Sequence, residues 1–515
     1  MSGDRTFWTL IAAAAQREPD RRLLSDDHGR NLTARQFHDA ACATAAGFAE
    51  SGIGARTVVS WQLPTTLETM VVMAALARLG AVQNPIIPLL REHEVGFITG
   101  QLSTEFLVVP ELWRGFDHGG LARALSSDKG FEVITVDLVT PPVGGELRLP
   151  RSGVDGLAAP GEPTGDTRWI YYSSGTTAAP KGIRHTDASV IAGSAGVLNM
   201  IGAASSDVNP IVFPIAHIGG AAMLAAALLT GMRLALFEAF DPGTTPLTVA
   251  AHHPTLLGMA TPFFVAYLEA QRAHGDRPLF PSVRACLAGG APTTAELGRQ
   301  VRETFGVAGI ANSWGLTEFP VATAPAFTAA AEVLDYTVGP PVPGVRVRVV
   351  DNSENELPAG REGELRLRGP QCFLGYADAT LDAGAFDKDG WLRTGDLGLV
   401  DADGNVRVTG RIKDAIIRNA ENVSALEVEN ALSTHPAVAD VAVIGVPDPS
   451  AGERVCAVVV PVSVDGVSLE SLVQHCQLQG LSRYKFPERL VIVDVLPRNQ
   501  VGKVIKKDLR EAFAS

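Results

Sequence analysis

Cysteine and positive charge are both scarce in this sequence. The chain of 515 residues contains five cysteines, an odd number, and no two of them are spaced as Cys-x-x-Cys. Neither a disulfide framework nor a zinc site is therefore predicted, and a reducing, cytoplasmic compartment is expected. The formal net charge is -13, so no basic field exists to attract nucleic acid or anionic lipid. Anionic ligands must instead be bound locally by a few placed groups.

Apolar runs long enough to cross a membrane are also lacking. Spanning requires about 20 apolar residues, and the best candidate, 218–237, is interrupted by three glycines and Arg233. This segment predicts a buried helix followed by a buried strand. The apolar stretch 10–15 is shorter and leads directly into charged residues, so no secretion signal is expected there.

Helix and strand signals alternate through most of the chain. Thr33 and Gln36 have capping-box spacing ahead of a helix that ends near Gly52, and 57–63 then has the composition of a buried strand. An apolar helix at 67–79 follows. This alternation predicts an α/β fold in which helices cover a parallel sheet.

Near Gly410 the pattern changes to short strands with helices between them. The strand signals there are 441–446, 455–462 and 490–495. We therefore expect a large α/β domain over residues 1–411 and a smaller α+β domain over residues 412–515.

The loop after a predicted strand at 168–172 is rich in groups that bind phosphate. Hydroxyl donors, free backbone amides and a terminal lysine occur together in Ser173-Ser174-Gly175-Thr176-Thr177-Ala178-Ala179-Pro180-Lys181. Such a loop can surround phosphate oxygens with donors and one cation. It is not a Walker A loop, because no Gly-Lys-Ser/Thr closes it. An ordinary polar turn has the same composition, so the loop alone leaves both interpretations open.

Five further blocks place this loop in a larger pattern. In order, they are Gly289-Gly290-Ala291-Pro292, Trp314-Gly315-Leu316-Thr317-Glu318, Thr394-Gly395-Asp396, Gly410-Arg411-Ile412-Lys413-Asp414 and Asn499 to Lys503. Together with the loop they span nearly the whole chain, and they resemble the adenylate-forming superfamily in its acyl-CoA synthetase branch. That superfamily contains acyl-CoA synthetases, nonribosomal adenylation domains and beetle luciferases. The resemblance implies a multi-sheet large domain and a mobile small domain that rotates about a hinge at Lys413.

The resemblance also implies how ATP is bound. The phosphates would be held by Ser173, Ser174, Gly175, Thr176, Thr177 and Lys181, and the adenine would be bracketed by Gly290, Ala291, Pro292 and Trp314, with Gly315 and Thr317 beside it. An aromatic ring can stack on a purine. Asp396 matches an aspartate that accepts hydrogen bonds from the ribose hydroxyls, and Arg411 matches a second ribose or phosphate contact.

Three residues match catalytic positions of the superfamily: Lys181, Glu318 and Lys503. Glu318, together with Thr176, would bind Mg²⁺, a hard cation that bridges phosphates and a carboxylate. Lys503 would enter the large domain during adenylation and bridge the attacking carboxylate and the α-phosphate. On their own, these residues could equally begin a surface turn, in the case of Glu318, or belong to a solvated basic helix, in the case of Lys503.

The acid is expected to be apolar. Amino-acid-activating relatives carry an aspartate for the substrate ammonium where this chain has His217, so an amino acid is disfavoured. The other candidates for the acyl pocket are mostly small and uncharged, namely Ile218, Gly219, Gly220, Ala288, Gly289, Ala311 and Ser313. They leave volume for a hydrophobic body, and cyclic and polycyclic acids are among the candidates. Without the resemblance, a buried histidine hydrogen-bonded to backbone is the more common explanation of His217.

The second step is less well defined by the sequence. The superfamily usually has Arg-Gly-Gly-Glu-Asn after the hinge, whereas this chain has Arg418-Asn419-Ala420-Glu421-Asn422. The resemblance places Arg418, Ala420 and Glu421 at the tunnel for coenzyme A, where a methyl group on Ala420 could hinder thioester formation. Transfer to CoA is expected. A half-reaction enzyme, a loader of an acyl carrier protein and a nucleotide-binding scaffold without catalysis remain as alternatives.

Overall fold

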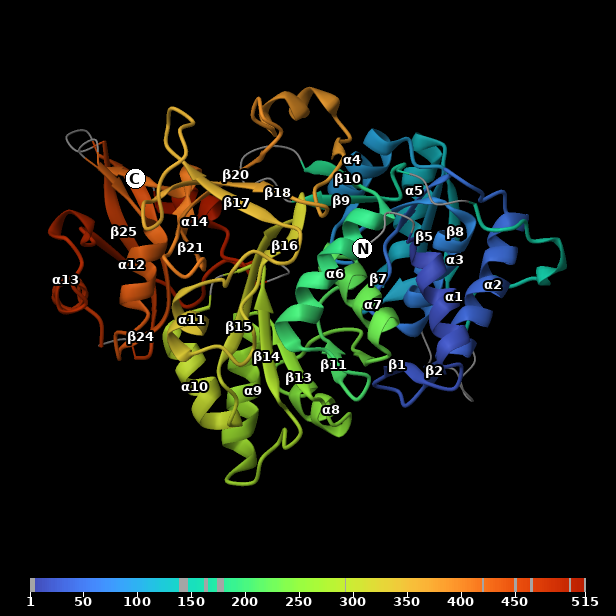
Figure 1. Cartoon of the computed structure of the whole chain (residues 1–515), viewed down its shortest axis with the longest axis horizontal. Coiled ribbons are helices and arrows are strands. Elements are labelled where there is room, and N and C mark those ends of the chain that lie inside the picture. Colours follow the sequence, from blue (N-terminus) through green and yellow to red (C-terminus); the bar gives the residue numbers. More distant parts are fainter. Residues whose placement is uncertain are drawn as a thin grey trace.

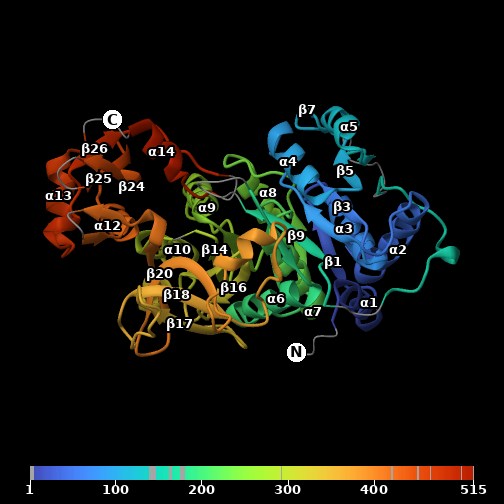
Figure 2. The same ribbon diagram turned by 90° about the horizontal axis from the view of Figure 1, so that it is seen from above.

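The chain folds into a large α/β domain and a smaller α+β domain at its C-terminal end (Figures 1 and 2). The computed structural model describes residues 5–138, 147–161, 165–173, 180–291, 293–418, 421–448, 452–463, 466–499 and 502–513. The smaller domain, orange to red in both views, lies at one end of the long axis. The predicted fold class is therefore confirmed.

The largest sheet among the described residues has the strand order β19-β10-β9-β4-β3-β5-β8. Its members are β3 (Val58–Trp61), β4 (Val82–Pro85), β5 (Phe106–Pro110), β8 (Glu132–Val136), β9 (Trp169–Ser173), β10 (Lys181–His185) and β19 (Gly375–Tyr376). The five strands from β8 to β9 run parallel, whereas β10 is antiparallel to both of its neighbours. Helix α3 (Leu67–Leu79) is buried along nearly its whole length and packs against α2 (Ala34–Glu50), as expected of a mainly apolar helix.

Within the described ranges, three four-stranded sheets and a two-stranded one, β6 (Leu112–Trp113) with β7 (Phe116–Asp117), complete the large domain. One has the order β11-β12-β1-β2, from Val208–Ile211, Arg233–Leu236, Arg22–Asp26 and Asn31–Thr33. The next has the order β13-β14-β15-β16, from Leu256–Met259, Ala285–Gly289, Ile310–Leu316 and Phe319–Thr323. The third is antiparallel, β17-β18-β20-β21, from Arg346–Val350, Gly363–Arg368, Leu392–Val400 and Val406–Arg411. Helices of this domain include α1 (Phe7–Arg17), α6 (Asp187–Ile201), α7 (Ile218–Thr230), α9 (Thr261–His274) and α10 (Ala295–Phe305).

The C-terminal domain has its own sheet and its own hydrophobic core. The sheet pairs β23-β22-β25-β24, with β26 beside β25, from Glu421–Val423, Ile416–Arg418, Gly452–Pro461, Val438–Asp448 and Arg489–Ile492. Its helices are α12 (Ala425–Leu432), α13 (Leu469–Leu478) and α14 (Lys506–Phe513). Apolar residues of α12, α13, β24 and β25 pack into one buried cluster, so this domain buries a core of its own.

Most local predictions in the large domain are confirmed. Thr33 and Gln36 form a reciprocal capping box at the start of α2, and the predicted helix at 67–79 is α3. The segment 218–237 forms α7 followed by β12, and no helix of the described chain is long and apolar enough to span a bilayer. One element that the sequence analysis did not predict matters for the site, namely strand β10, which follows the predicted phosphate loop. Its residues pair with β9 on one side and β19 on the other, and this pairing satisfies their backbone groups.

Candidate active site

Lys181 begins β10 directly opposite Ser173, the last residue of β9. The loop residues between them that were predicted to bind phosphate, Ser174, Gly175, Thr176 and Thr177, lie outside the described residues. The Nζ atom of Lys181 lies 5.2 Å from the centre of the Tyr376 ring, within the range of a cation–π contact. The hairpin therefore presents a lysine at the end of the predicted phosphate loop, with an aromatic ring beside it.

Tyr376 connects Lys181 with Glu318. Its hydroxyl donates to Oε1 of Glu318 over 3.0 Å, while its ring faces Lys181. Burial, and then the negative charge of Glu318, raise the pKa of Tyr376, so the phenol stays protonated and remains a donor. No spacing in the sequence signals this residue. Its contacts arise because β19 pairs with β10, which is nearly 200 residues earlier in the chain; Tyr376 lies opposite Ile183.

A buried histidine holds the backbone of the turn that carries Glu318. His185 Nε2 lies 2.8 Å from the carbonyl oxygen of Thr317, and Nδ1 lies 2.9 Å from the hydroxyl of Ser189. Burial lowers the pKa of His185 to about 4, so the imidazole is neutral at physiological pH. Because a carbonyl only accepts, Nε2 carries the proton and donates to Thr317. His185 was also absent from the sequence prediction.

Trp314 and Arg411 both lie against the carboxylate of Asp396. The indole Nε1 of Trp314 donates to Oδ2 of Asp396 over 2.9 Å, and Nε of Arg411 lies 3.0 Å from Oδ1. The register of β20 and β21 places Asp396 directly opposite Arg411. Asp396 is 3% exposed. Although Arg411 forms an ion pair with Oδ1, its N–H is not aligned for a hydrogen bond, and no other described group donates to this oxygen. An oxygen in this state fits a hydroxyl donor of a ligand, as predicted for a ribose.

Glycines shape the predicted adenine edge. Gly290 follows β14 with φ +77°, in the left-handed region that favours glycine. In β15, a Cβ on Gly315 would lie 2.6 Å from the backbone nitrogen of Val321, so a larger residue would force the hairpin open. The carbonyl of Ala291 accepts a long hydrogen bond of 3.5 Å from Asn312. Pro292 lies outside the described residues.

Lys503 lies in the same electrostatic environment as Asp396 and Arg411, although it comes from the C-terminal domain. Burial, and then the positive charge of Arg411, lower the pKa of Lys503 to about 8, while Asp396 and Asp414 act in the opposite direction. Its backbone N–H donates to Oδ1 of Asn499 over 2.9 Å, which closes a tight turn.

The neighbouring residue of this turn touches the large domain. A Cβ on Gly502 would lie 2.8 Å from the ring of Pro262, at the start of α9. The turn is also tied to its own domain, because Arg498 donates to the carbonyl of Gly502 and pairs with Asp440, each over 2.6 Å. Gly502, next to the C-terminal lysine, therefore contacts the large domain while Arg498 ties it to its own domain.

His217 is the N-cap residue of α7. Its Nδ1 accepts from the N–H of Gly219 over 3.3 Å, and burial lowers its pKa, so the ring is neutral. A cavity of about 30 Å³ beside it is lined mainly by apolar side chains. The lining residues are Pro85, Ile86, Ile87, Leu90, Ile98, Tyr171, Tyr172, Ala216, His217, Ile218 and Thr317. This volume is that of about one water molecule, so an acyl body would have to displace side chains.

The structure separates the remaining acyl candidates from that cavity. Ala288, Gly289, Ala311 and Ser313 lie on the adjacent strands β14 and β15, and none of them lines it. Ala288 and Ala311 are fully buried in hydrophobic clusters, and Ser313 donates to the carbonyl of Ala288 over 3.1 Å. Gly220, in the first turn of α7, lies so close to Ile215 that a Cβ would approach its carbonyl oxygen to 2.3 Å.

The predicted CoA segment follows the hinge candidate. Lys413 lies in the short turn Ile412–Asp414 between β21 and β22. Arg418, at the end of β22, forms a two-point ion pair with Glu488, with distances of 2.7 and 2.8 Å. Ala420 lies outside the described residues, and Glu421 begins β23.

Protein groups alone do not form a metal site here. Among the described residues, no group of three or more His, Cys, Asp or Glu side chains could hold a metal ion. Mg²⁺ usually takes only one or two carboxylates and completes its shell with phosphate oxygens and water. Glu318, whose Oε1 is held by Tyr376, fits that single carboxylate.

Comparison with known proteins gives matches along the whole chain. A family model described as AMP-binding enzyme matches residues 11–377, and one described as AMP-binding enzyme C-terminal domain matches residues 427–503. A medium-chain fatty-acid–CoA ligase of Escherichia coli (strain K12) is 29% identical, with 99% of this chain and 90% of the relative covered. A salicyl-AMP ligase / salicyl-S-ArCP synthetase of Mycobacterium tuberculosis is 30% identical, with 98% and 90% covered. The crystal structure of ATP-bound MatB from Rhodopseudomonas palustris matches with a TM-score of 0.89 and 26% identity over 99% of both chains.

Proposed function

The chain belongs to the AMP-binding enzyme family, and from that premise we propose that it is an acyl-CoA synthetase for a hydrophobic carboxylic acid. Its membership makes it an ATP-dependent, AMP-forming acid ligase of the adenylate-forming superfamily. The nature of the acid, the transfer to CoA and the roles of individual residues are parts of the proposal.

One observation carries the proposal: Gly502, next to Lys503, lies against Pro262 of the large domain, and the charges of Arg411 and Asp396 act on Lys503. In the first step, a carboxylate oxygen of the acid attacks the α-phosphorus of ATP, and the bond from that phosphorus to pyrophosphate breaks. Both reacting partners are anions, so the ammonium of Lys503 would offset their repulsion at the point of attack. Asp396 and Arg411 would orient the ribose. Lys181 would bind the leaving phosphates, and Glu318 would hold Mg²⁺, which neutralises phosphate charge when bound.

The second step requires a rearrangement. The thiolate of CoA attacks the acyl carbonyl, the bond to AMP breaks, and AMP leaves with the bonding electrons. We assign residues 1–411 and 412–515 to two domains that rotate about Lys413, because Lys503 and the segment that begins at Arg418 both belong to the smaller domain and would act on the large domain in different steps. The ion pair between Arg418 and Glu488 would hold this segment while adenylation proceeds.

We propose an apolar acid because, among the described residues, no charged side chain that could pair with a charged group of the substrate lines the cavity at His217. The imidazole is neutral, and the cavity beside it is lined mainly by isoleucines, leucine, proline and alanine. A substrate ammonium would be buried there without a carboxylate partner, which is strongly unfavourable. Medium-length aliphatic, aromatic and polycyclic acids are the candidates.

A screen of carboxylic acids for pyrophosphate release tests the proposal. We expect acid-dependent release with apolar acids and none above background with amino acids. Absence of release with every acid would contradict adenylation, and release only with amino acids would contradict the proposed specificity. The product mixture should then contain acyl-CoA when CoA is added.

Two related functions, a half-reaction enzyme and a loader of a carrier protein, can be distinguished by analysing the products of the same reaction. The methyl group of Ala420, where the superfamily motif that this chain resembles usually has glycine, favours a half-reaction enzyme that releases acyl-AMP but forms no thioester. In that case Ala420→Gly should restore acyl-CoA formation. The relative named as a salicyl-S-ArCP synthetase favours transfer to a carrier-protein thiol. Supplying CoA and a phosphopantetheinylated carrier in parallel would identify the acceptor.

A further inference from the structure

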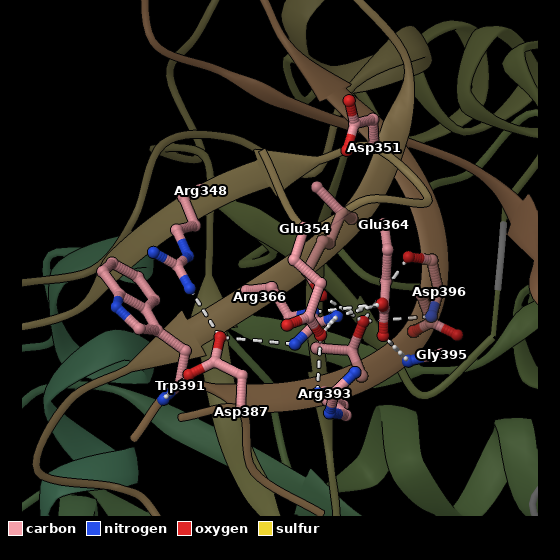
Figure 3. Close-up of polar contacts among 12 residues, drawn as sticks. Arg348, Asp351, Glu354, Glu364, Arg366, Asp387, Trp391, Arg393, Gly395 and Asp396 are labelled. Carbon is pink, nitrogen blue, oxygen red and sulfur yellow. Dashed lines mark hydrogen bonds and ion pairs between the residues drawn. The ribbon is translucent and has the colours of Figure 1, made fainter. Parts of the chain in front are cut away.

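A buried arginine lies beside the bulge at residues 394–396 of β20, which carries Asp396 (the turn 394–396). Arg366, on β18, is 2% exposed and is surrounded by carboxylates (Figure 3). Its Nη2 lies 2.7 Å from Glu364 and 3.4 Å from Glu354, and its Nη1 lies 3.3 Å from Asp387. A buried guanidinium is stable only when it is paired in this way. The cluster therefore fixes the carboxylate of Glu364 in one orientation.

Glu364 uses its two oxygens for two different donors. Oε2 accepts from Nε of Arg366 over 3.0 Å, and Oε1 accepts from the backbone N–H of Gly395 over 3.2 Å (Figure 3). Gly395 has φ +68°, in the left-handed region, and a Cβ there would meet nothing within 4 Å. Glycine is therefore favoured at this position by its backbone angle and not by crowding. The next residue is Asp396.

A second contact ties the same turn to β18. The hydroxyl of Thr394 donates to the carbonyl of Leu365 over 2.6 Å and accepts from the N–H of Asp396 over 3.0 Å. Two consecutive residues of β18 therefore bind this segment: Glu364 accepts from Gly395, and Leu365 accepts from Thr394. The backbone before Asp396 is thus held by β18, whereas the carboxylate of Asp396 is held by Trp314 and Arg411.

We propose that Glu364, held in place by Arg366, is a positioning residue that sets the sugar selectivity of the nucleotide site through Asp396. The inference rests on the proposed function, in which Asp396 accepts hydrogen bonds from the ribose hydroxyls. A hydrogen bond to a ribose depends steeply on the position of the acceptor. Loss of the contact between Glu364 and Gly395 releases the turn and reduces the preference for a nucleotide with a 2′-hydroxyl.

The rest of the cluster provides a matched control. Glu354 also pairs with Arg366, at 3.4 Å, and with Arg393, at 2.6 Å, but it has no contact among the described residues with the backbone of the turn 394–396. If the cluster only stabilised the β17–β18 hairpin, neutralising Glu354 and neutralising Glu364 would have the same kind of effect. If Glu364 positions Asp396, only Glu364 affects sugar selectivity.

Glu364→Gln tests the proposal with the least change in shape. Glutamine has one acceptor oxygen, so its amide nitrogen must face either Arg366 or the N–H of Gly395, and one contact is lost. The readouts are kcat/KM for ATP and 2′-deoxyATP in pyrophosphate release, and the affinities for both nucleotides by calorimetry. We expect the ratio of kcat/KM for ATP to that for 2′-deoxyATP to fall about tenfold, and the unfolding temperature to fall as well, because one carboxylate partner of the buried Arg366 becomes neutral. Glu354→Gln should keep the wild-type ratio.

Each outcome for these variants either supports or overturns the positioning role of Glu364. A folded Glu364→Gln variant with the wild-type ratio overturns the inference, and so does an equal fall in Glu354→Gln. If Glu364→Gln does not fold, Glu364→Asp keeps the charge beside Arg366 but is one methylene too short to reach Gly395, and the same fall is expected. Asp396→Ala identifies the source of a failure. If it leaves the ratio unchanged, the ribose role of Asp396 itself is wrong and the inference about Glu364 fails with it, whereas failure of the proposed function would appear as absence of acid-dependent pyrophosphate release.

Discussion

The indole nitrogen of Trp314 donates to the carboxylate of Asp396 over 2.9 Å, although 82 residues separate them in the chain. The bond links the residue predicted to face the adenine with the residue predicted to bind the ribose. Trp314 is 8% exposed, so its ring is fixed by packing as well as by this contact. A nucleotide bound here would meet both groups as one rigid unit.

Trp314→Phe should weaken ATP binding selectively. Phenylalanine keeps an aromatic face but removes the N–H, which leaves the buried carboxylate of Asp396 with one donor fewer. A hydrogen bond to a charged group contributes about 1.5–3 kcal/mol, so KM for ATP should rise roughly tenfold or more with kcat little changed. Pyrophosphate release at varied ATP concentration measures this. Trp8→Phe, at a similarly buried tryptophan in α1, should leave KM unchanged.

Tyr376→Phe should alter the dependence on magnesium. The variant keeps the ring beside Lys181 but removes the hydroxyl that donates to Glu318. Glu318 then loses a fixed orientation, and the Mg²⁺ concentration for half-maximal activity should rise about fivefold, as for loss of a group that orients a metal ligand. Activity at varied Mg²⁺ measures the effect. Tyr172→Phe removes a comparable hydroxyl, bound to Gln101, and an equal shift in that variant would contradict the specific role of Tyr376.

Lys503→Ala should abolish adenylation while nucleotide binding persists. Its ammonium is proposed to stabilise charge at the point of attack, and loss of such a group costs about 100-fold or more in kcat. ATP affinity, measured by calorimetry, should change little, because Asp396, Arg411 and Trp314 remain in place. Lys507→Ala removes a lysine of α14 that faces solvent, 3.7 Å from Glu511, and should retain full activity. Normal acyl-AMP formation by Lys503→Ala would disprove the assigned role.

The pH dependence of adenylation should report the same lysine. The pKa of Lys503 is lowered to about 8, first by burial and then by Arg411, and the protonated form is the one required. Therefore kcat/KM should be constant below this value and fall as pH rises through it. In the pH profile of kcat, the fall in activity should occur at a higher pH than in that of kcat/KM, because bound phosphates stabilise the ammonium form of Lys503. A flat kcat/KM profile from about pH 7 to about pH 9.5 would contradict this assignment.

Local sequence signals predicted much of the fold. The capping box of Thr33 and Gln36, the apolar helix Leu67–Leu79 and the change of pattern near Gly410 all depend on neighbouring residues, which interact whatever the rest of the chain does. The hairpin of β9 and β10 was not predicted. Its pairing is completed by β19, which is nearly 200 residues away.

The sequence by itself determined the family pattern and the chemical types at the site: a lysine at the end of a hydroxyl-rich loop, a glutamate, an aspartate, and a lysine near the C-terminus. Motif spacing carries that information because each block is local. Only the tertiary structure decided which groups meet. Trp314 reaches Asp396, Tyr376 joins Lys181 to Glu318, and Glu364 holds the turn before Asp396. These contacts follow from strand register and buried charge pairing, which bring distant segments to hydrogen-bonding distance and leave no trace in local spacing.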